Sequence, residues 1–256
     1  MLTHIDLNSD MGERDDAIGL ALDADLMPFI TSVNIACGGH AGSPHLMRRT
    51  AQLAVQQGVA IGAHPGLPDR EGFGRTEQNL PPPAITALVI EQVHTLVSLL
   101  SQDGLRLAHV KPHGALYNLA ATDRAVAQAI VQAVKAVDPT LCLYALAGSV
   151  LVTVAREAGL IVVSEAFADR AYRPDGRLVP RSEKGALLES PDAVRRQLRQ
   201  LITGSVISVD GSSVPVQAES ICLHSDTAHA VPLARMIRQE LASAGLAVAA
   251  PRRRHA

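Results

Sequence analysis

The sequence predicts a single α/β domain, a (β/α) barrel of about seven parallel strands that covers residues 1–256. Short apolar runs alternate with helix-like segments along the whole chain, and four of these runs end in titratable residues. Strict alternation of this kind implies parallel strands joined by right-handed crossovers. An open sheet would gather its reactive residues near one switch point. Here they follow strands from one end of the chain to the other, which favours the barrel.

The expected strands are short apolar runs bounded by turn residues. They fall near residues 4–8, 32–36, 59–63, 107–111, 141–146, 160–164 and 220–224. The expected helices lie near residues 17–30, 44–57, 82–102, 122–137, 148–158, 191–203 and 228–244. Ser43-Pro44 and Ser190-Pro191 each place a capping residue before a proline, which indicates a helix start. A separate stretch from Val206 predicts a small inserted hairpin, and residues 251–256 predict a flexible tail.

Composition limits the classes of partner. Hydrophobic residues make up 47% of the chain, enough for a large interior, and the net charge is only -2. A chain with this charge balance offers no basic field for nucleic acid or for an acidic membrane surface. The sequence has no signal peptide pattern and no uninterrupted apolar run near 20 residues. Its three cysteines are widely spaced, so we expect a cytoplasmic protein with reduced thiols and no membrane contact.

The first strand carries polar residues where a buried strand should be apolar. Asp6, Asn8 and Asp10 fall on one side of an extended segment because side chains repeat every second residue. A parallel strand is buried on both faces, so polar residues inside it indicate a function. The alternative is a loop of capping and turn residues.

Histidines follow three further runs. His40 lies among glycines before a helix start, His64 comes directly off a strand, and His113 follows Lys111 by two residues. A lone histidine is more often structural than catalytic. Several strand-end histidines beside a lysine indicate a reactive site.

A long polar loop follows the sixth strand, and such connections inside a compact domain are usually functional. Arginines there could bind a carboxylate or phosphate with two parallel hydrogen bonds, or the loop could be a solvated charged segment. The last strand ends in further titratable residues. The candidates from these two regions are Glu165, Asp169, Arg170, Arg181, His224 and Asp226. The chain has neither a GxxxxGK[ST] phosphate loop nor a GxGxxG motif, so we expect no nucleotide site of its own.

Six long motifs occur in order: DLNSDMGE, NIACGGHAG, GVAIGAHPGLPDREGFGR, HVKPHGALYN, EAFADRAYRPDGRLVPRSEKGAL and ICLHSD. With them the chain resembles the LamB/YcsF family over nearly its whole length. The resemblance implies a barrel of the polysaccharide-deacetylase type. It also implies hydrolytic opening of the 5-oxoproline (pyroglutamate) lactam to L-glutamate, coupled to ATP hydrolysis. Subunits B and C of this 5-oxoprolinase would be the partners, and ATP would be used by the complex rather than by a phosphate loop in this chain.

On that reading, Asp10 or Asp6 is the general base on water, and His64 and His113 polarise the carbonyl or assist proton transfer. The oxyanion is expected to be stabilised by Lys111 and Asn8. The substrate carboxylate is assigned to Arg170 or Arg181, and further substrate contacts are expected from His40, Glu165, Asp169, His224 and Asp226.

Asp10, His64 and His113 also form a set of one carboxylate and two imidazoles found in hydrolytic metal sites, so a divalent metal is a further hypothesis. Two other functions stay open. One is a metal-dependent deacetylase or amidase that acts alone, and the other is a binding subunit without catalysis.

Overall fold

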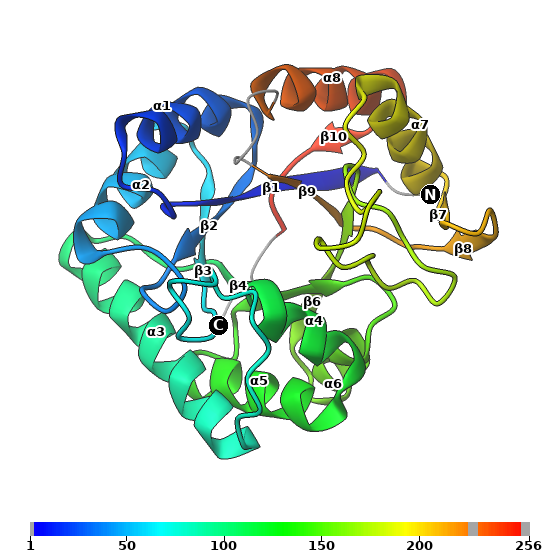
Figure 1. The fold of residues 1–256 in the computed structure, drawn as a ribbon. Helices are drawn as coiled ribbons and strands as arrows, with labels where there is room; N and C mark the ends of the chain where they lie inside the picture. The colour runs from blue at the N-terminus through cyan, green and yellow to red at the C-terminus, as the bar shows by residue number, and fades with distance from the viewer. Residues whose placement is uncertain (1–2, 225–229, 252–256) are drawn as a thin grey trace.

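A closed parallel barrel forms the centre of the molecule (Figure 1). The computed structural model describes residues 3–224 and 230–251. Within these residues seven strands pair in the order β1, β2, β3, β4, β5, β6 and β9, and β9 pairs back to β1. They are β1 (His4–Met11), β2 (Ser32–Ala36), β3 (Ala60–His64), β4 (His109–Val110), β5 (Cys142–Leu146), β6 (Ile161–Phe167) and β9 (Ser220–His224). The predicted barrel of about seven parallel strands is confirmed.

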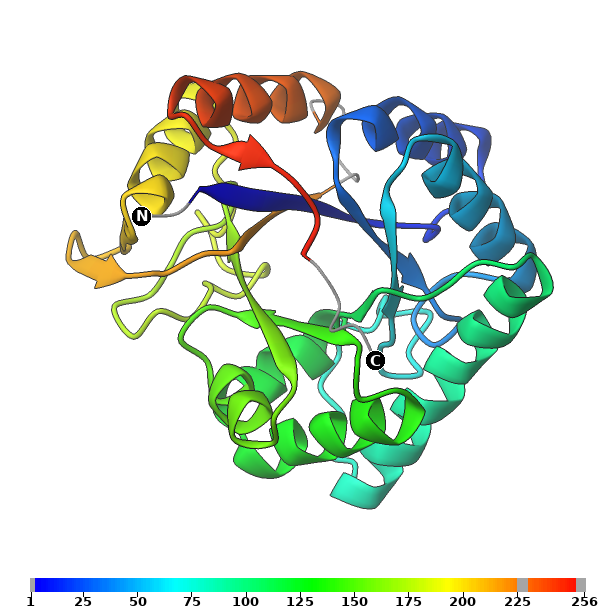
Figure 2. The ribbon, with the colours of Figure 1, turned by 180° about the vertical axis from the view of Figure 1, so that it is seen from behind.

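Two small additions accompany the barrel. The predicted hairpin is present as β7 (Ser205–Ile207) and β8 (Ser213–Pro215), which pair antiparallel before β9. A short strand that the sequence did not predict, β10 (Ala247–Val248), pairs in parallel with the start of β1. Seen from behind, β10 lies beside the amino-terminal part of β1, at the end of the barrel away from the long connecting loops (Figure 2).

The helices surround the barrel as a ring. They are α1 (Ala17–Leu26), the 3-10 helix η1 (Met27–Phe29), α2 (Pro44–Gln56), α3 (Pro82–Gln102), α4 (Gly114–Thr122), α5 (Arg124–Val137), α6 (Val150–Glu157), α7 (Pro191–Ile202) and α8 (Ala230–Ser243). The side chains of Ser43 and Ser190 cap α2 and α7 as predicted, because each accepts a hydrogen bond from a backbone N–H of the first turn. Within the described residues, α3 is the only helix that is both long enough and apolar enough to cross a membrane. Length and composition alone decide this, and a barrel helix with one face packed on the core also meets both criteria.

The helix expected over residues 122–137 is confirmed as α5 (Arg124–Val137), and a further helix, α4 (Gly114–Thr122), precedes it. Asp123 has an extended backbone, and its side chain accepts hydrogen bonds from the backbone N–H groups of Ala125 and Val126. It therefore ends α4 and caps α5. Helix α4 was not among the expected helices; it begins directly after His113, close to the end of β4.

The barrel interior is polar although its walls are apolar. Leucine, isoleucine and valine side chains from strands and helices form one large core cluster. Fully buried polar side chains point from the strands toward each other inside the barrel, and they include Asp6, Asn8, Ser32, Asn34, His109, Tyr144, Glu165 and Ser220. Buried polar groups are costly unless they are hydrogen-bonded. These side chains meet that cost by hydrogen-bonding to one another. Their network extends from the middle of the barrel to Asp10 at its carboxyl end.

Candidate active site

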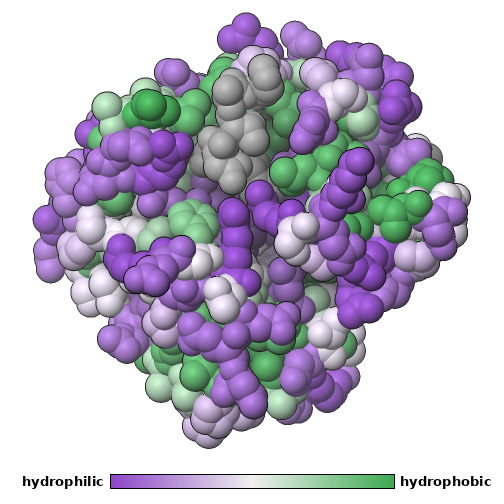
Figure 3. All heavy atoms as spheres, in the orientation of Figure 1, coloured by the Kyte–Doolittle hydropathy of each residue, from purple (hydrophilic) through white to green (hydrophobic). Residues whose placement is uncertain are grey.

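A cavity of about 720 Å³ opens at the carboxyl ends of the strands. Hydrophilic side chains gather around the centre of this face of the molecule (Figure 3). The cavity is lined in part by Asp10, Glu13, His64, Lys111, His113, Arg170 and Arg181. These side chains come from segments far apart in the sequence, and only closure of the barrel brings them together.

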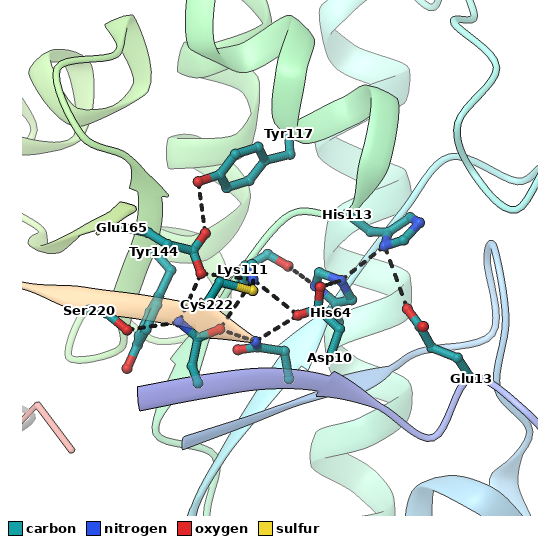
Figure 4. A network of polar contacts seen from close by, with 12 residues as sticks. Asp10, Glu13, His64, Lys111, His113, Tyr117, Tyr144, Glu165, Ser220 and Cys222 are labelled. Carbon is teal, nitrogen blue, oxygen red and sulfur yellow. Dashed lines mark hydrogen bonds and ion pairs between the residues drawn. The ribbon is translucent and has the colours of Figure 1, made fainter. Parts of the chain in front are cut away.

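Lys111 lies at the floor of this cavity between two carboxylates (Figure 4). Its Nζ is 3.0 Å from Oδ1 of Asp10 and 2.8 Å from Oε1 of Glu165, and it also donates to Oδ1 of Asn8 at 3.1 Å. Burial lowers the pKa of Lys111, but the negative charges around it, above all that of Asp10, raise this pKa well above its usual value. The ammonium group is therefore charged at neutral pH and lies beside the cavity.

His64 and His113 face each other through the ring nitrogens that do not contact the backbone. The Nδ1 of His64 is 2.7 Å from the backbone oxygen of Lys111, and the Nε2 of His113 is 2.9 Å from the backbone oxygen of Phe73. A carbonyl oxygen only accepts hydrogen bonds, so each of these nitrogens carries the ring proton. The remaining nitrogens, Nε2 of His64 and Nδ1 of His113, are 2.9 Å apart. Two ring nitrogens at this distance are satisfied either by a proton between them or by a metal cation beside them.

Glu13 and His40 complete this cluster. The ring of His40 stacks on that of His113 with centroids 3.6 Å apart, and its Nε2 is 3.2 Å from Oε1 of Glu13. Burial lowers the pKa of His40 to about 2, so this ring is neutral. One ligand atom from each of Glu13, His40, His64 and His113 lies within 4.8 Å of the others. Neutral imidazoles and a carboxylate are the ligands that zinc and similar divalent metals prefer.

Comparison with known proteins agrees with the family that the six motifs indicated. The model of the LamB/YcsF family matches residues 5–256. The chain belongs to the LamB/YcsF family. It is 49% identical over 247 residues to the 5-oxoprolinase A subunit of Heliobacterium modesticaldum, covering 96% of this chain and 97% of that one. It is 47% identical to the protein of the same name from Bacillus subtilis, with 96% of both chains covered.

Two solved structures share the fold of this LamB/YcsF chain. The lactam utilization protein from Thermus thermophilus matches with a TM-score of 0.88 and 44% identity, over 97% of this chain and 100% of that one. A putative cellobiose-phosphate cleavage protein from Enterococcus faecalis V583 matches at a TM-score of 0.55 and 11% identity, over 97% of each chain, which shows a likeness of fold alone. The relation to polysaccharide deacetylases stays a prediction.

The structure brings the central residues predicted for this LamB/YcsF chain together. Asp10, His64, Lys111 and His113 meet at one end of the cavity, and Arg170 and Arg181 line the same cavity. Asn8 and Glu165 lie beneath Lys111, where Asn8 donates from Nδ2 to Oε1 of Glu165 at 2.8 Å.

Asp6 lies deeper than the sequence suggested. It accepts hydrogen bonds from the hydroxyl groups of Thr31, Ser32, Tyr144 and Ser220, and it does not line the cavity. Burial raises its pKa. Asp6 is therefore placed to organise the barrel interior, and Asp10 is the carboxylate that faces the cavity.

The long loop after β6 is ordered around Arg170. Arg170 is only 6% exposed, and its Nη2 donates to the backbone oxygen of Val179 at 2.7 Å. Its Nε is buried without a partner among the described residues, and burial lowers its pKa to about 10, so the guanidinium stays charged. The backbone oxygen of the neighbouring Asp169 accepts from Leu188 and ties the loop together. A buried charged donor at the cavity favours an anion site over a solvated loop.

At the end of β9, the last strand of the barrel, only the backbone is described. The backbone of His224 pairs with that of Asp10, while its side chain and the whole of Asp226 lie outside the described residues.

Four residues of this network were not among the predicted site residues: Glu13, Asn34, His109 and Tyr117. Asn34 and His109 are polar residues inside apolar runs, which is the same signal that singled out Asp6 and Asn8. Tyr117 lies on α4 and donates to Oε2 of Glu165 at 2.7 Å. Nothing in the sequence shows that its hydroxyl reaches into the barrel.

Proposed function

We propose that this chain is the A subunit of a 5-oxoprolinase, a hydrolase that opens the lactam of 5-oxoproline to L-glutamate. Relatives of that name share 47% to 49% of their residues with it over nearly their whole length. We further propose that it works as a single domain in the cytoplasm with subunits B and C, and that the complex hydrolyses ATP. The cavity geometry supports this reaction as follows.

The position of the Asp10 carboxylate is the main structural support for the proposal. Its Oδ1 is 3.0 Å from the charged Lys111, and its Oδ2 is 3.3 Å from Nε2 of His64. A carboxylate next to a fixed cation remains ionised and can take a proton from water at the cavity wall. The water oxygen then bonds to the lactam carbonyl carbon, the ring C–N bond breaks, and the nitrogen receives a proton to become the amine of glutamate.

Lys111 and Arg170 supply positive charge for this reaction. The Lys111 ammonium lies at the cavity floor, where it stabilises the negative charge that develops on the carbonyl oxygen. The charged guanidinium of Arg170, which lines the cavity, is suited to bind the carboxylate that 5-oxoproline bears beside its ring nitrogen.

The residues present also fit a divalent metal. We propose that Glu13, His40, His64 and His113 hold it, with Asp10 beside them. The backbone carbonyls that fix the ring protons of His64 and His113 are typical partners of metal-binding histidines. Such a metal, when bound, lowers the pKa of a water molecule and polarises a carbonyl group. The same cluster makes a metal-dependent amidase that acts alone the second candidate function.

The test is reconstitution. The chain is co-expressed with subunits B and C, and glutamate release from 5-oxoproline is measured with and without ATP. D10N, H64A and H113A should lower the rate at least about 10²-fold while circular dichroism stays unchanged. N79A and H94A, at exposed positions, should leave it unchanged.

Release of glutamate by the chain alone without ATP would favour the second candidate. Full activity of all three site variants in the complex would instead indicate a binding subunit without catalysis and would overturn the proposal.

A further inference from the structure

We infer that Asn34 is a positioning residue that orients the carboxylate of Asp10, and that His109 fixes Asn34 by reaching across Gly62. The inference deepens the proposed function, because it assigns the parts of the barrel that hold its general base. None of these three residues lines the cavity.

Strand register places the four residues in one row. Asp10 of β1 pairs with Asn34 of β2, Asn34 pairs with Gly62 of β3, and Gly62 pairs with His109 of β4. Side chains at the same level of neighbouring parallel strands point to the same side of the sheet. All four positions therefore face the barrel interior in one row across the strands, which begins with Asp10 at the cavity.

The amide of Asn34 has only one orientation that satisfies its neighbours. Its Nδ2 is 2.8 Å from Oδ1 of Asp10 and 2.7 Å from Oδ1 of Asn8, and both of these oxygens are acceptors in this arrangement. Its Oδ1 is 2.7 Å from Nε2 of His109. A flipped amide would place its oxygen against two other oxygens and lose both hydrogen bonds. The amide therefore donates to Asp10 and accepts from His109.

His109 fixes that orientation because its Nε2 carries the ring proton. Burial, followed by the charge of Lys111, lowers the pKa of His109 to about 3, so the ring is neutral and has a single N–H. Its ring also packs against Tyr144, with centroids 4.4 Å apart. A ring that cannot turn holds its hydrogen-bond partner in one place.

Gly62 makes this contact between strands β2 and β4 geometrically feasible. His109 must pass over the intervening strand β3 to reach Asn34, and a Cβ atom on residue 62 would overlap its imidazole ring. Every other residue type carries a Cβ atom, so only glycine leaves this space. The glycine is thus part of the support of Asp10, although it has no functional group.

The two carboxylate oxygens of Asp10 therefore have different partners. Oδ1 accepts from Asn34 and Lys111, and Oδ2 lies 3.3 Å from Nε2 of His64. Loss of the Asn34 donor removes a rigid contact of Oδ1 and keeps the one to the flexible Lys111 side chain, so the carboxylate can rotate. A misplacement of about 1 Å in an active site costs on the order of 10²-fold in rate.

The experiment uses the reconstituted complex with N34A, H109A, G62A and the double variant G62A/H109A. The first two should lower kcat about 10- to 100-fold with KM within about twofold of the wild type, because neither residue touches the substrate. G62A should lower kcat similarly by displacing the His109 ring. The double variant should be no worse than H109A, because the clash is gone once the ring is removed. N79A and H94A serve as matched exposed controls.

Two outcomes would overturn the inference. One is a rise in KM with unchanged kcat in N34A, which would mean that Asn34 binds substrate. The other is a full additional loss from G62A in the H109A background, which would mean that the glycine acts independently of His109.

A structural readout separates this inference from the proposed function. Crystal structures of N34A and H109A should show the Oδ2 of Asp10 displaced from Nε2 of His64 by about 1 Å or more relative to the wild type. This comparison does not depend on any reaction. A wild-type complex without 5-oxoprolinase activity would contradict the proposed function, whereas an unmoved Asp10 would contradict the positioning role.

Discussion

The ammonium group of Lys111 and the carboxylate of Glu165 form an ion pair inside the barrel, with Nζ 2.8 Å from Oε1. The side chain of Lys111 is 3% exposed and that of Glu165 is 0% exposed. The second oxygen of Glu165 accepts from the hydroxyl of Tyr117, and Lys111 also contacts Asp10. The charge of Lys111 therefore stabilises the carboxylates of both Asp10 and Glu165, and both lose this stabilisation when the lysine is replaced.

Replacing Lys111 should destabilise the fold as well as the site. K111M leaves Glu165 charged and buried without its partner, so we expect a loss of about 3 to 5 kcal/mol in the free energy of unfolding. Adding E165Q should restore part of it, because the uncompensated charge is removed. Urea unfolding measures both. K135M, at an exposed position, is the control, and a K111M value within about 1 kcal/mol of the wild type would contradict this account.

His109 should make stability depend on pH. Its pKa is about 3 in the folded chain against an ordinary value of 6.5, so below pH 6.5 the unfolded chain takes up a proton that the folded chain does not. The free energy of unfolding therefore falls as the pH falls from about 6.5 toward 3, by about 2 kcal/mol from this residue at pH 5.

The variant H109Q should lose this part of the pH dependence. Urea unfolding of H109Q and of H94Q at pH 7.5 and pH 5 tests it, since His94 is exposed. An equal pH dependence in the two variants would show that His109 does not titrate as described.

The histidine cluster should bind a divalent metal. We expect about one Zn²⁺ for each purified wild-type chain by elemental analysis, and a higher melting temperature after Zn²⁺ is added. H64A and H113A should lose both effects because each removes one of the facing lone pairs. Zinc binding by these variants that equals the wild type would reject the site. His64 and His113 would then share a proton and not a metal ion.

Gly74 should be needed for the arrangement of the same cluster. It has a φ of 65°, and a Cβ there would lie 2.6 Å from Cβ of His40 and 2.9 Å from Cδ2 of His113. G74A should therefore lower both the melting temperature and the activity. G104A is the matched control, because Gly104 has a φ of 69° with no atom near its Cβ position. A change in activity that is equal in the two variants would indicate backbone strain alone.

Much of the site was predictable because strand ends in a parallel barrel meet at one face. Asp10, His64, Lys111 and His113 lie at or just after the carboxyl ends of three different strands, and the prediction that they meet rested on that rule. The rule gives no depth, so it did not separate Asp6 from Asp10. These residues lie four positions apart on β1, and only the second reaches the cavity.

The amino-acid sequence by itself determined the barrel, most of its helix starts and the family, because apolar periodicity, capping serines and long motifs are local signals. The tertiary structure alone decided which polar side chains touch. Asn34, Gly62 and His109 become one unit only through strand register. Glu13 joins His40, His64 and His113 only through loop geometry. Contacts between segments that are distant along the chain depend on pairing register and on the space between side chains, and neither leaves a local pattern in the sequence.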